Sequence, residues 1–494
     1  MSSNDVRKLP LAQRLRFLAK DSLLYGGASA IERSLALITF PILARHFSIE
    51  EYGWIDLFTV WVMLFSRTLV FGQDSAVARY YYEYEAVEAR RQLISQSLIL
   101  QVSLIILLLP FILVFGPVII GMLVQSPDAR YLMRLALLQV PFIVLINFSQ
   151  NLLKWTFRRR AFLTVSLGSS LTFVAGLVIW AKWFTLSIEA LYVIAITTKL
   201  VFALFGVWLS RKWLTVPANF KFMREMLPFA IPYGCISLIG TLVPVFERSI
   251  TAWILGAREL GAYAVAAKIA MLLNLIVQAF QMAWGPFSMS LYKQRDAIQT
   301  YNVVLKIFTL VICLCSLGAA LFAPGLLALL TAGRYAEGAA VVFPLAMAVA
   351  AQAIGWVVGI GIGFSKKSYL TLYAYLVYLP VSLGAIYVLG SLFGLAGIAF
   401  GSMLGFIVRA VIEAWLAQRA HPMAWSYRRP LMIVGVTILL GTLLYRVPSS
   451  LQGGTQWLIA AVAYSALWVG AFLVMFDRPT RARIWSLLDR RSRS

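Results

Sequence analysis

The chain has 494 residues, of which 61% are hydrophobic and 13% are charged, and its mean hydropathy is +0.83. This composition excludes an ordinary soluble globular protein and is typical of a polytopic membrane protein. The formal net charge of +23 would indicate a nucleic-acid partner in a soluble chain, but the placement of the cations gives another explanation.

Apolar runs long enough to cross a bilayer recur along the whole chain. Residues 1–20 mix Leu and Phe with cations, and we expect this segment to lie on the cytoplasmic membrane interface. A basic tail follows the last run at 477–494. Between these segments the sequence predicts fourteen helical spans, at 21–45, 54–75, 93–115, 131–153, 161–180, 189–210, 228–255, 261–285, 303–323, 339–363, 369–389, 394–416, 430–446 and 456–476.

Lys and Arg residues of the termini, the loops and the adjoining span ends are unevenly distributed between the two sides. Thirty lie in or next to the terminal segments and alternate loops, with Lys306 at a span end among them, whereas five lie in or next to the remaining loops, with Arg446 at a span end among them. By the positive-inside rule, both termini and the basic loops are cytoplasmic. Topology and attraction to anionic lipids therefore account for the net charge, and we expect no nucleic-acid partner. Cys235, Cys313 and Cys315 fall inside spans and are interpreted as small apolar residues, so no disulfide framework or metal site is expected.

The chain contains an internal repeat. Residues 25–84 align without gaps with residues 233–292, and twelve of the sixty positions are identical, among them Gly53 and Gly261. The offset encloses six spans, an even number, which predicts a parallel repeat about an axis along the membrane normal. We therefore expect an all-α protein with two six-helix lobes and a cleft between them. The predicted parts are an N-lobe at 21–210, a cytoplasmic linker at 211–227, a C-lobe at 228–416 and an extra helix pair at 430–476.

Two short motifs carry a resemblance to a known family. The first span ends in Pro-Ile-Leu-Ala-Arg at 41–45, and Ser-Ile-Glu-Glu-Tyr-Gly follows at 48–53. With the span count and the repeat, these motifs resemble bacterial polysaccharide flippases of the O-antigen and exopolysaccharide type. These flippases belong to the multidrug/oligosaccharidyl-lipid/polysaccharide exporter superfamily. Fourteen spans are also similar to the lipid II flippase branch, whose extra helix pair forms a groove for the lipid tail.

The resemblance implies a function in the synthesis of surface polysaccharides such as lipopolysaccharide and exopolysaccharide. The cargo would be an undecaprenyl-pyrophosphate-linked oligosaccharide, moved by alternating access from the cytoplasmic to the periplasmic leaflet of the bacterial inner membrane. Membrane lipids, a polysaccharide polymerase and other assembly proteins would be its partners.

When Lys306 and Arg446 are counted with the loops next to them, eight basic residues lie inside predicted spans, where a charge is costly unless it lines a cavity, meets a partner or reaches an interface. We expect four of them, one from each of the first two spans of each lobe, to form a cationic cavity that binds the pyrophosphate. The alternative is ion pairing that holds the helix bundle together. In the second span, a polar stripe includes Asp56, Thr59, Met63 and Arg67. The four predicted cavity residues are Arg33, Arg67, Arg248 and Lys268.

Other charged residues inside the spans are secondary candidates. Lys199 lies in the middle of its span, and Arg409 can pair with Glu413 one turn further on. Arg33 and Arg248 each follow a glutamate, but adjacent helical residues point in different directions, so we expect each arginine to need a partner on another helix. No cofactor is expected. A coupling proton or sodium ion remains open, and the carboxylates that are candidates for it are Glu32, Asp74 and Glu247.

Two rival functions make different demands on the sequence. A cation-coupled multidrug exporter of the same superfamily needs buried carboxylates and a cavity for cationic drugs, whereas basic residues outnumber acidic ones in these spans. A membrane polysaccharide polymerase or ligase needs catalytic loops on the outer side, but the loops at 116–130 and 324–338 are short. The sequence therefore favours a transporter over an enzyme.

Overall fold

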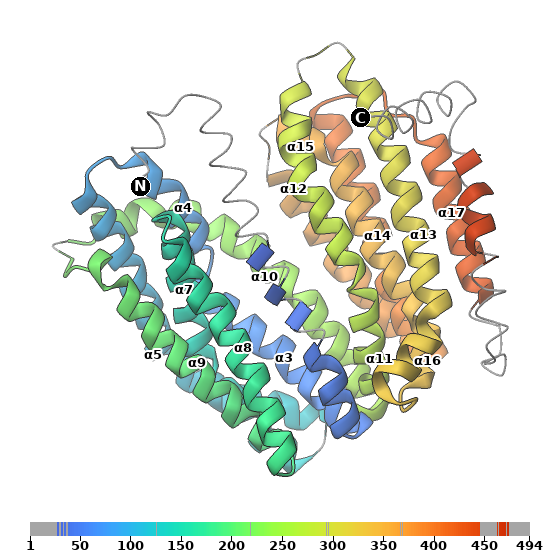
Figure 1. Ribbon diagram of the computed structural model, residues 1–494. Coiled ribbons are helices and arrows are strands. Elements are labelled where there is room, and N and C mark those ends of the chain that lie inside the picture. Colours follow the sequence, from blue (N-terminus) through green and yellow to red (C-terminus); the bar gives the residue numbers. More distant parts are fainter. Residues whose placement is uncertain are drawn as a thin grey trace, which may run out of the picture. The chain divides into compact units, whose positions relative to one another are not determined.

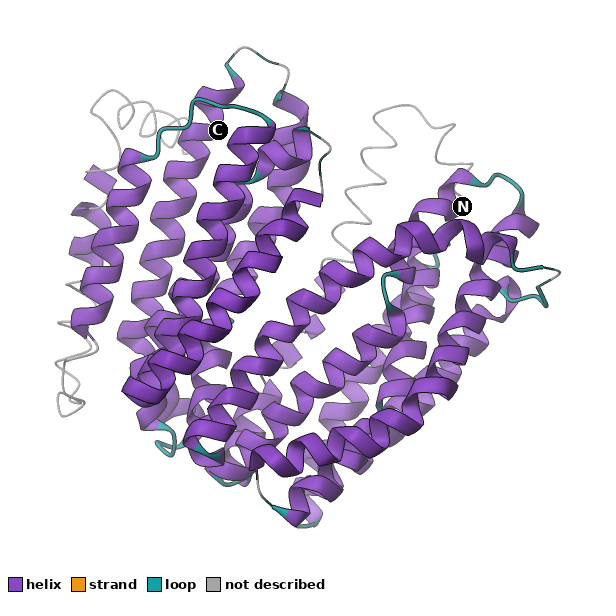
Figure 2. Ribbon diagram, turned by 180° about the vertical axis from the view of Figure 1, so that it is seen from behind, coloured by secondary structure: helices purple, strands orange, loops and turns teal. Residues whose placement is uncertain are grey.

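The computed structural model describes most of the chain, and its described residues form helices and connecting loops with no strand among them (Figure 2). In each of the fourteen predicted spans, most of the residues that the structure describes are helical. Within the described part, nine helices are long and apolar enough to cross a membrane, or ten if the bent pair at 257–291 is one span. The described residues are 27–28, 31–32, 34–35, 38–124, 126–217, 219–292, 294, 296–365, 367, 369–444, 462, 464–470 and 472–473.

The chain divides into two compact units, residues 1–261 and 262–494. In the first unit, α7 packs against both α8 and α9, α3 packs against α7, and α10 packs against α3, α4 and α5 (Figure 1). Described residues before α3, between 27 and 46, are helical too. The elements of this unit are α3 (Ile49–Val70), α4 (Gln73–Glu83), α5 (Val87–Val124), α6 (Pro127–Leu137), α7 (Val140–Trp155), α8 (Arg159–Trp183), α9 (Ile188–Ser210), the 3₁₀ helix η1 (Arg211–Trp213) and α10 (Lys221–Leu255).

The motif at 48–53 forms the start of α3. The Ser48 hydroxyl accepts a hydrogen bond from the Glu51 backbone N–H at 3.1 Å, and the Glu51 carboxylate accepts one from the Ser48 N–H at 2.8 Å. This capping box satisfies two backbone donors that an open helix end leaves unpaired. Gly53 lies one turn further on, where a Cβ atom would come within 2.4 Å of the Ala257 carbonyl oxygen. The motif therefore combines a helix cap with a site of close backbone contact.

Helix α10 belongs by packing to the first unit. Gly72, which precedes α4, and Gly234 of α10 bring their backbones together, because a Cβ on Gly72 would lie 2.5 Å from the Gly234 nitrogen. The packing division at Gly261 therefore differs from the repeat-based one, in which this helix opens the second lobe and the boundary lies at 211–227. The three prolines at 228, 232 and 244 lie inside a continuous helix.

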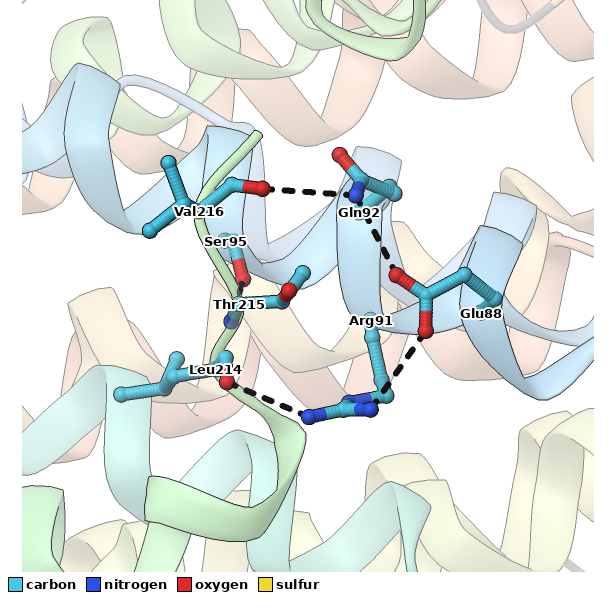
Figure 3. Close-up of polar contacts among 7 residues, drawn as sticks. All are labelled: Glu88, Arg91, Gln92, Ser95, Leu214, Thr215 and Val216. Carbon is cyan, nitrogen blue, oxygen red and sulfur yellow. Dashed lines mark hydrogen bonds and ion pairs between the residues drawn. The ribbon is translucent and has the colours of Figure 1, made fainter. Parts of the chain in front are cut away.

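The linker before α10 is hydrogen-bonded to the first turns of α5 (Figure 3). Ser95 accepts a hydrogen bond from the Thr215 N–H at 2.8 Å, and Arg91 donates to the Leu214 carbonyl at 3.5 Å. The fully buried Gln96 donates to the Asn219 carbonyl at 2.7 Å and accepts from the Met223 N–H at 2.8 Å. Side chains of α5 thus satisfy backbone groups of the linker and of the first turn of α10.

The second unit packs around α14, which contacts both α13 and α16. Gly394 interrupts α16 with φ 60° and ψ −139°, a conformation that glycine adopts without steric penalty. The break separates two of the predicted spans, 369–389 and 394–416. Helix α11 (Ala257–Ala270) crosses the boundary between the units. The other elements are α12 (Leu273–Leu291), α13 (Ala297–Thr331), η2 (Ala336–Val341), α14 (Val342–Val358), α15 (Ile360–Phe364), α16 (Tyr369–Ala420) and α17 (Arg428–Leu444).

Candidate functional site

The first unit contains a cavity of about 460 Å³ between α3, α7 and α9, which we call the main compartment. Its walls combine apolar side chains with two cations, Arg67 and Lys199, and no aspartate or glutamate stands among the described residues that line it. A pocket with this lining attracts an anion, because the positive charges are not neutralised by an acid within the same wall. Its uncharged polar lining residues are Thr39, Thr59, Ser66, Gln139, Asn147 and Tyr192.

Arg67 reaches the main compartment from the last turn of α3. It is half-buried, and its guanidinium has no hydrogen bond or ion pair among the described residues. Thr59 and Met63 lie two turns and one turn before it and line the same wall. The predicted polar stripe of this span therefore faces a cavity, as expected for Thr59, Met63 and Arg67. An arginine without an acidic partner keeps its forked donors free for a phosphate.

Lys199 reaches the main compartment from the middle of α9. Its ammonium donates a hydrogen bond to the Gln139 amide oxygen at 2.5 Å and lies 5.8 Å from the centre of the Phe173 ring. Gln139 occupies the break between α6 and α7, just before Pro141. Proline cannot donate the backbone hydrogen bond that would continue α6, so the break at this point follows from the sequence. The bond to Gln139 leaves the charge of Lys199 uncompensated.

A second compartment of about 340 Å³ lies between α7, α8 and α9. It shares five lining residues with the main compartment, Ile143, Asn147, Phe173, Ala195 and Lys199, so the two are continuous. Lys199 is the one charged residue among its described lining residues. The residues that line the second compartment alone are Ile146, Gln150, Ser169, Ser170 and Thr198.

Tyr192 lines the main compartment and carries a buried polar atom. The residue is 4% exposed, and its hydroxyl has no hydrogen-bond partner among the described residues. A buried hydroxyl without a partner is costly. The oxygen has almost no accessible surface, so Tyr192 lines the cavity without presenting this donor to a bound ligand.

Arg248 lies elsewhere, in a buried ion pair between α10 and α3. Its guanidinium is 3.0 Å from the Asp56 carboxylate and 3.0 Å from the Glu247 carboxylate, and all three side chains are nearly inaccessible. Beside them, the Trp61 indole donates to the Ser249 hydroxyl at 3.2 Å. Arg248 does not line either compartment, in contrast to its predicted place in the cavity. The ion pairing that we weighed as the alternative is what the structure shows.

Three expectations about ion pairs can be compared with the structure. The partner of Arg248 on another helix, Asp56, is present as expected. The expectation that adjacent residues do not pair is wrong for Glu247 and Arg248, because the long arginine side chain reaches back to its neighbour. The expected pair of Arg409 and Glu413 is confirmed, with two hydrogen bonds of 3.1 and 2.9 Å. That pair is buried and does not line the cavity.

None of the other predicted residues that the structure describes lines the main compartment. Lys268 is half-buried on α11 in the second unit, and Arg33 lies outside the described residues. Glu32 accepts a hydrogen bond from the Ser166 hydroxyl, and Asp74 lines a small neighbouring cavity. The Lys154 ammonium on α7 interacts electrostatically with both carboxylates.

Comparison with known proteins identifies the family. The polysaccharide biosynthesis protein family matches residues 18–292, which is more than half of the chain. The chain belongs to this family. Two proteins of Haemophilus influenzae are similar to this chain. One is described as an uncharacterized membrane protein and is 24% identical over 288 residues. The other is Lsg locus putative protein 1, which is 23% identical over 292 residues. Each match covers 56% of this chain and about two thirds of the relative, 66% and 68%.

Solved structures share the fold of this polysaccharide biosynthesis protein. An inward-closed lipid II flippase MurJ matches with a TM-score of 0.70 at 15% identity, over 91% of this chain and 99% of that one. An inward-facing multidrug resistance MATE transporter matches with a TM-score of 0.65 at 17% identity, over 82% and 95%. The predicted all-α fold is confirmed, and it is the fold of the solved lipid II flippase and multidrug transporter.

Lys199 ranked low in the sequence analysis because no second feature supported it. One signal in the sequence was Gln139, which stands just before the first turn of α7 and its Pro141. A glutamine at a helix break inside an apolar span needs a hydrogen-bond partner. Its partner on α9 follows from the packing of two helices sixty residues apart, which hydropathy does not report.

Proposed function

We propose that this protein moves an undecaprenyl-pyrophosphate-linked oligosaccharide from the cytoplasmic to the periplasmic leaflet of the bacterial inner membrane. The observation that carries the proposal is the main compartment, a polar cavity with two cations and no acid among its described lining residues. In a member of a polysaccharide biosynthesis family, the anion that fits such a site is the pyrophosphate of a lipid-linked sugar.

The two cations have different parts in this proposal. Arg67 offers a planar fork that contacts two phosphate oxygens, and Lys199 contributes a point charge held in place by Gln139. The polyprenyl chain stays in the lipid while the head group enters the cavity. With both termini cytoplasmic, an inside-negative potential favours outward movement of the anion by about 2.3 kcal/mol per charge per 100 mV.

Coupling to a proton or sodium ion is a separate part of the proposal. Glu32 and Asp74 are the carboxylates that we assign to it, because both interact electrostatically with Lys154, and Asp74 lines a small cavity that shares Val70 and Asn147 with the main compartment. Glu247 is a weaker candidate, since its carboxylate is already paired with Arg248.

The rival function, export of cationic drugs, has support from the MATE-like fold. The charge of the cavity argues against it, because Arg67 and Lys199 repel a cationic drug and no acid among the described lining residues attracts one.

Complementation of a strain that lacks its polysaccharide flippase tests the proposal. We expect the wild-type chain to restore surface polymer, and Arg67→Gln with Lys199→Gln to abolish export at normal membrane abundance. Thr164→Ala, an exposed position on α8 away from the cavity, serves as the control. Full export by the double variant would contradict the proposal, and drug resistance conferred without polymer export would favour the rival.

A further inference from the structure

We propose that the second compartment, between α7, α8 and α9, is a binding subsite for the sugar directly attached to the pyrophosphate. The inference rests on the proposed function, because the main compartment must bind the pyrophosphate for the neighbouring sugar to reach this subsite. It assigns a separate wall of the cavity to the glycan part of the cargo.

The first argument is the separation of charged and uncharged groups. Arg67 lines only the main compartment, whereas Lys199 lines both compartments. The residues that line the second compartment alone add an amide and hydroxyls but no further charge. A glycosyl pyrophosphate has the same order of groups, with anionic oxygens at one end and neutral hydroxyls at the other. A single ligand can therefore place its phosphates by Arg67 and Lys199 and its first sugar ring beyond them.

The second argument is the supply of hydrogen-bonding groups in the second compartment. Among the described residues, the Gln150 amide and the Thr198 hydroxyl make no side-chain hydrogen bond, although Thr198 is only 7% exposed. The hydroxyls of Ser169 and Ser170 donate to the Ser166 carbonyl at 3.0 and 3.3 Å, so their oxygens still accept. The site thus offers both donors and acceptors, which is what the hydroxyls of a sugar require.

The third argument is the shape and the apolar part of the lining. A volume of about 340 Å³ lies within the range of small-molecule sites. The Phe173 ring stands at the junction of the compartments, where it presents an apolar surface to the C–H groups of a sugar ring. Ala195 is the smallest side chain shared by both compartments, and its small size leaves room for a sugar ring at this junction.

Binding measurements on the full chain in lipid nanodiscs test this assignment. The probes are farnesyl pyrophosphate, which carries no sugar, and a panel of farnesyl-pyrophosphoryl monosaccharides that covers neutral hexoses, acetamido hexoses and deoxyhexoses. We expect at least one glycosylated probe to bind about tenfold more tightly than the bare pyrophosphate, the gain of one to two good hydrogen bonds. Gln150→Leu and Ser170→Ala should each remove most of this gain and leave the affinity for farnesyl pyrophosphate unchanged within about twofold.

Control variants separate the subsite from the proposed function. Arg67→Gln should weaken all probes alike, whereas Thr164→Ala on α8 should weaken none. Equal affinity of glycosylated and bare probes, or equal weakening of both by Gln150→Leu, would overturn the sugar subsite while the pyrophosphate site stands. Failure of every probe to bind the wild-type chain would overturn both. Ser170→Ala removes a single oxygen, so it keeps the test valid if the larger change at Gln150 impairs folding.

Discussion

Replacement of Arg248 by methionine would leave two buried carboxylates without the guanidinium that they share. The side chains of Arg248 and Asp56 are each 5% exposed, and that of Glu247 is 8% exposed, so water cannot take over the lost contacts. Removal of one partner from a buried ion pair costs about 3–5 kcal/mol. We therefore expect Arg248→Met to lower the free energy of unfolding by this amount and to reduce the abundance of the protein in the membrane.

Compensating changes make this prediction specific. Asp56→Leu combined with Glu247→Leu and Arg248→Met removes all three charges of this described ion pair, and replacement of a buried ionic group by apolar side chains is often neutral or stabilising. We expect the triple variant to recover most of the lost stability. Arg67→Met is the matched control, because its guanidinium has no acidic partner among the described residues, and we expect a change below about 1 kcal/mol.

Equilibrium unfolding in mixed detergent micelles, followed by tryptophan fluorescence, measures these differences. The reasoning is refuted if Arg248→Met unfolds like the wild-type protein and yet abolishes polymer export. That result would mean that Arg248 contacts the cargo and that its ion pair opens during transport.

Three further predictions follow from the packing of the helices. Gly53→Val should destabilise the protein by about 1–3 kcal/mol in the same assay, since a Cβ there lies 2.4 Å from a backbone oxygen, whereas Gly435→Ala, with no atom within 4 Å of its Cβ, should not. Gln96→Leu should make the linker at 214–220 sensitive to limited chymotrypsin digestion after Leu214 or Phe220, because two backbone groups lose their partner, and unchanged digestion would argue against that anchoring. Arg409→Met should lower the unfolding midpoint strongly while Arg409→Met with Glu413→Leu restores it, and equal midpoints for the single and double variants would contradict a buried pair.

Hydropathy and charge were enough to predict the fold class and the spans, because membrane helices must satisfy their backbone hydrogen bonds internally and therefore leave long apolar runs. The repeat aligned Gly53 with Gly261 as equivalent positions. It did not predict that these two glycines approach each other, with Gly53 Cβ 2.9 Å from the Gly261 nitrogen. Contact between equivalent positions depends on where helices cross, so the packing of α11 on α3 at these glycines could not be read from periodicity.

The candidate site was predicted in part for the same reason. Helical spacing correctly placed Thr59, Met63 and Arg67 on one polar face, because a single helix determines that relation. Asp56 belongs to the same predicted stripe but forms an ion pair with Arg248. Lys199 is held at the cavity by its hydrogen bond to Gln139. The sequence of one helix determines how deep along that helix a charged residue lies. The packing of the neighbouring helix determines whether the residue forms an ion pair or lines a cavity.

Flipping of a lipid-linked oligosaccharide by the purified protein in proteoliposomes tests the central claim most directly. The measured quantity is the rate at which head groups of a fluorescent substrate become accessible on the opposite side, at matched protein incorporation. We predict that Arg67→Gln with Lys199→Gln slows this rate by at least about a hundredfold, as expected for loss of two charged contacts to the pyrophosphate. A double variant that flips the substrate at the wild-type rate would contradict the assignment of this cavity to the cargo.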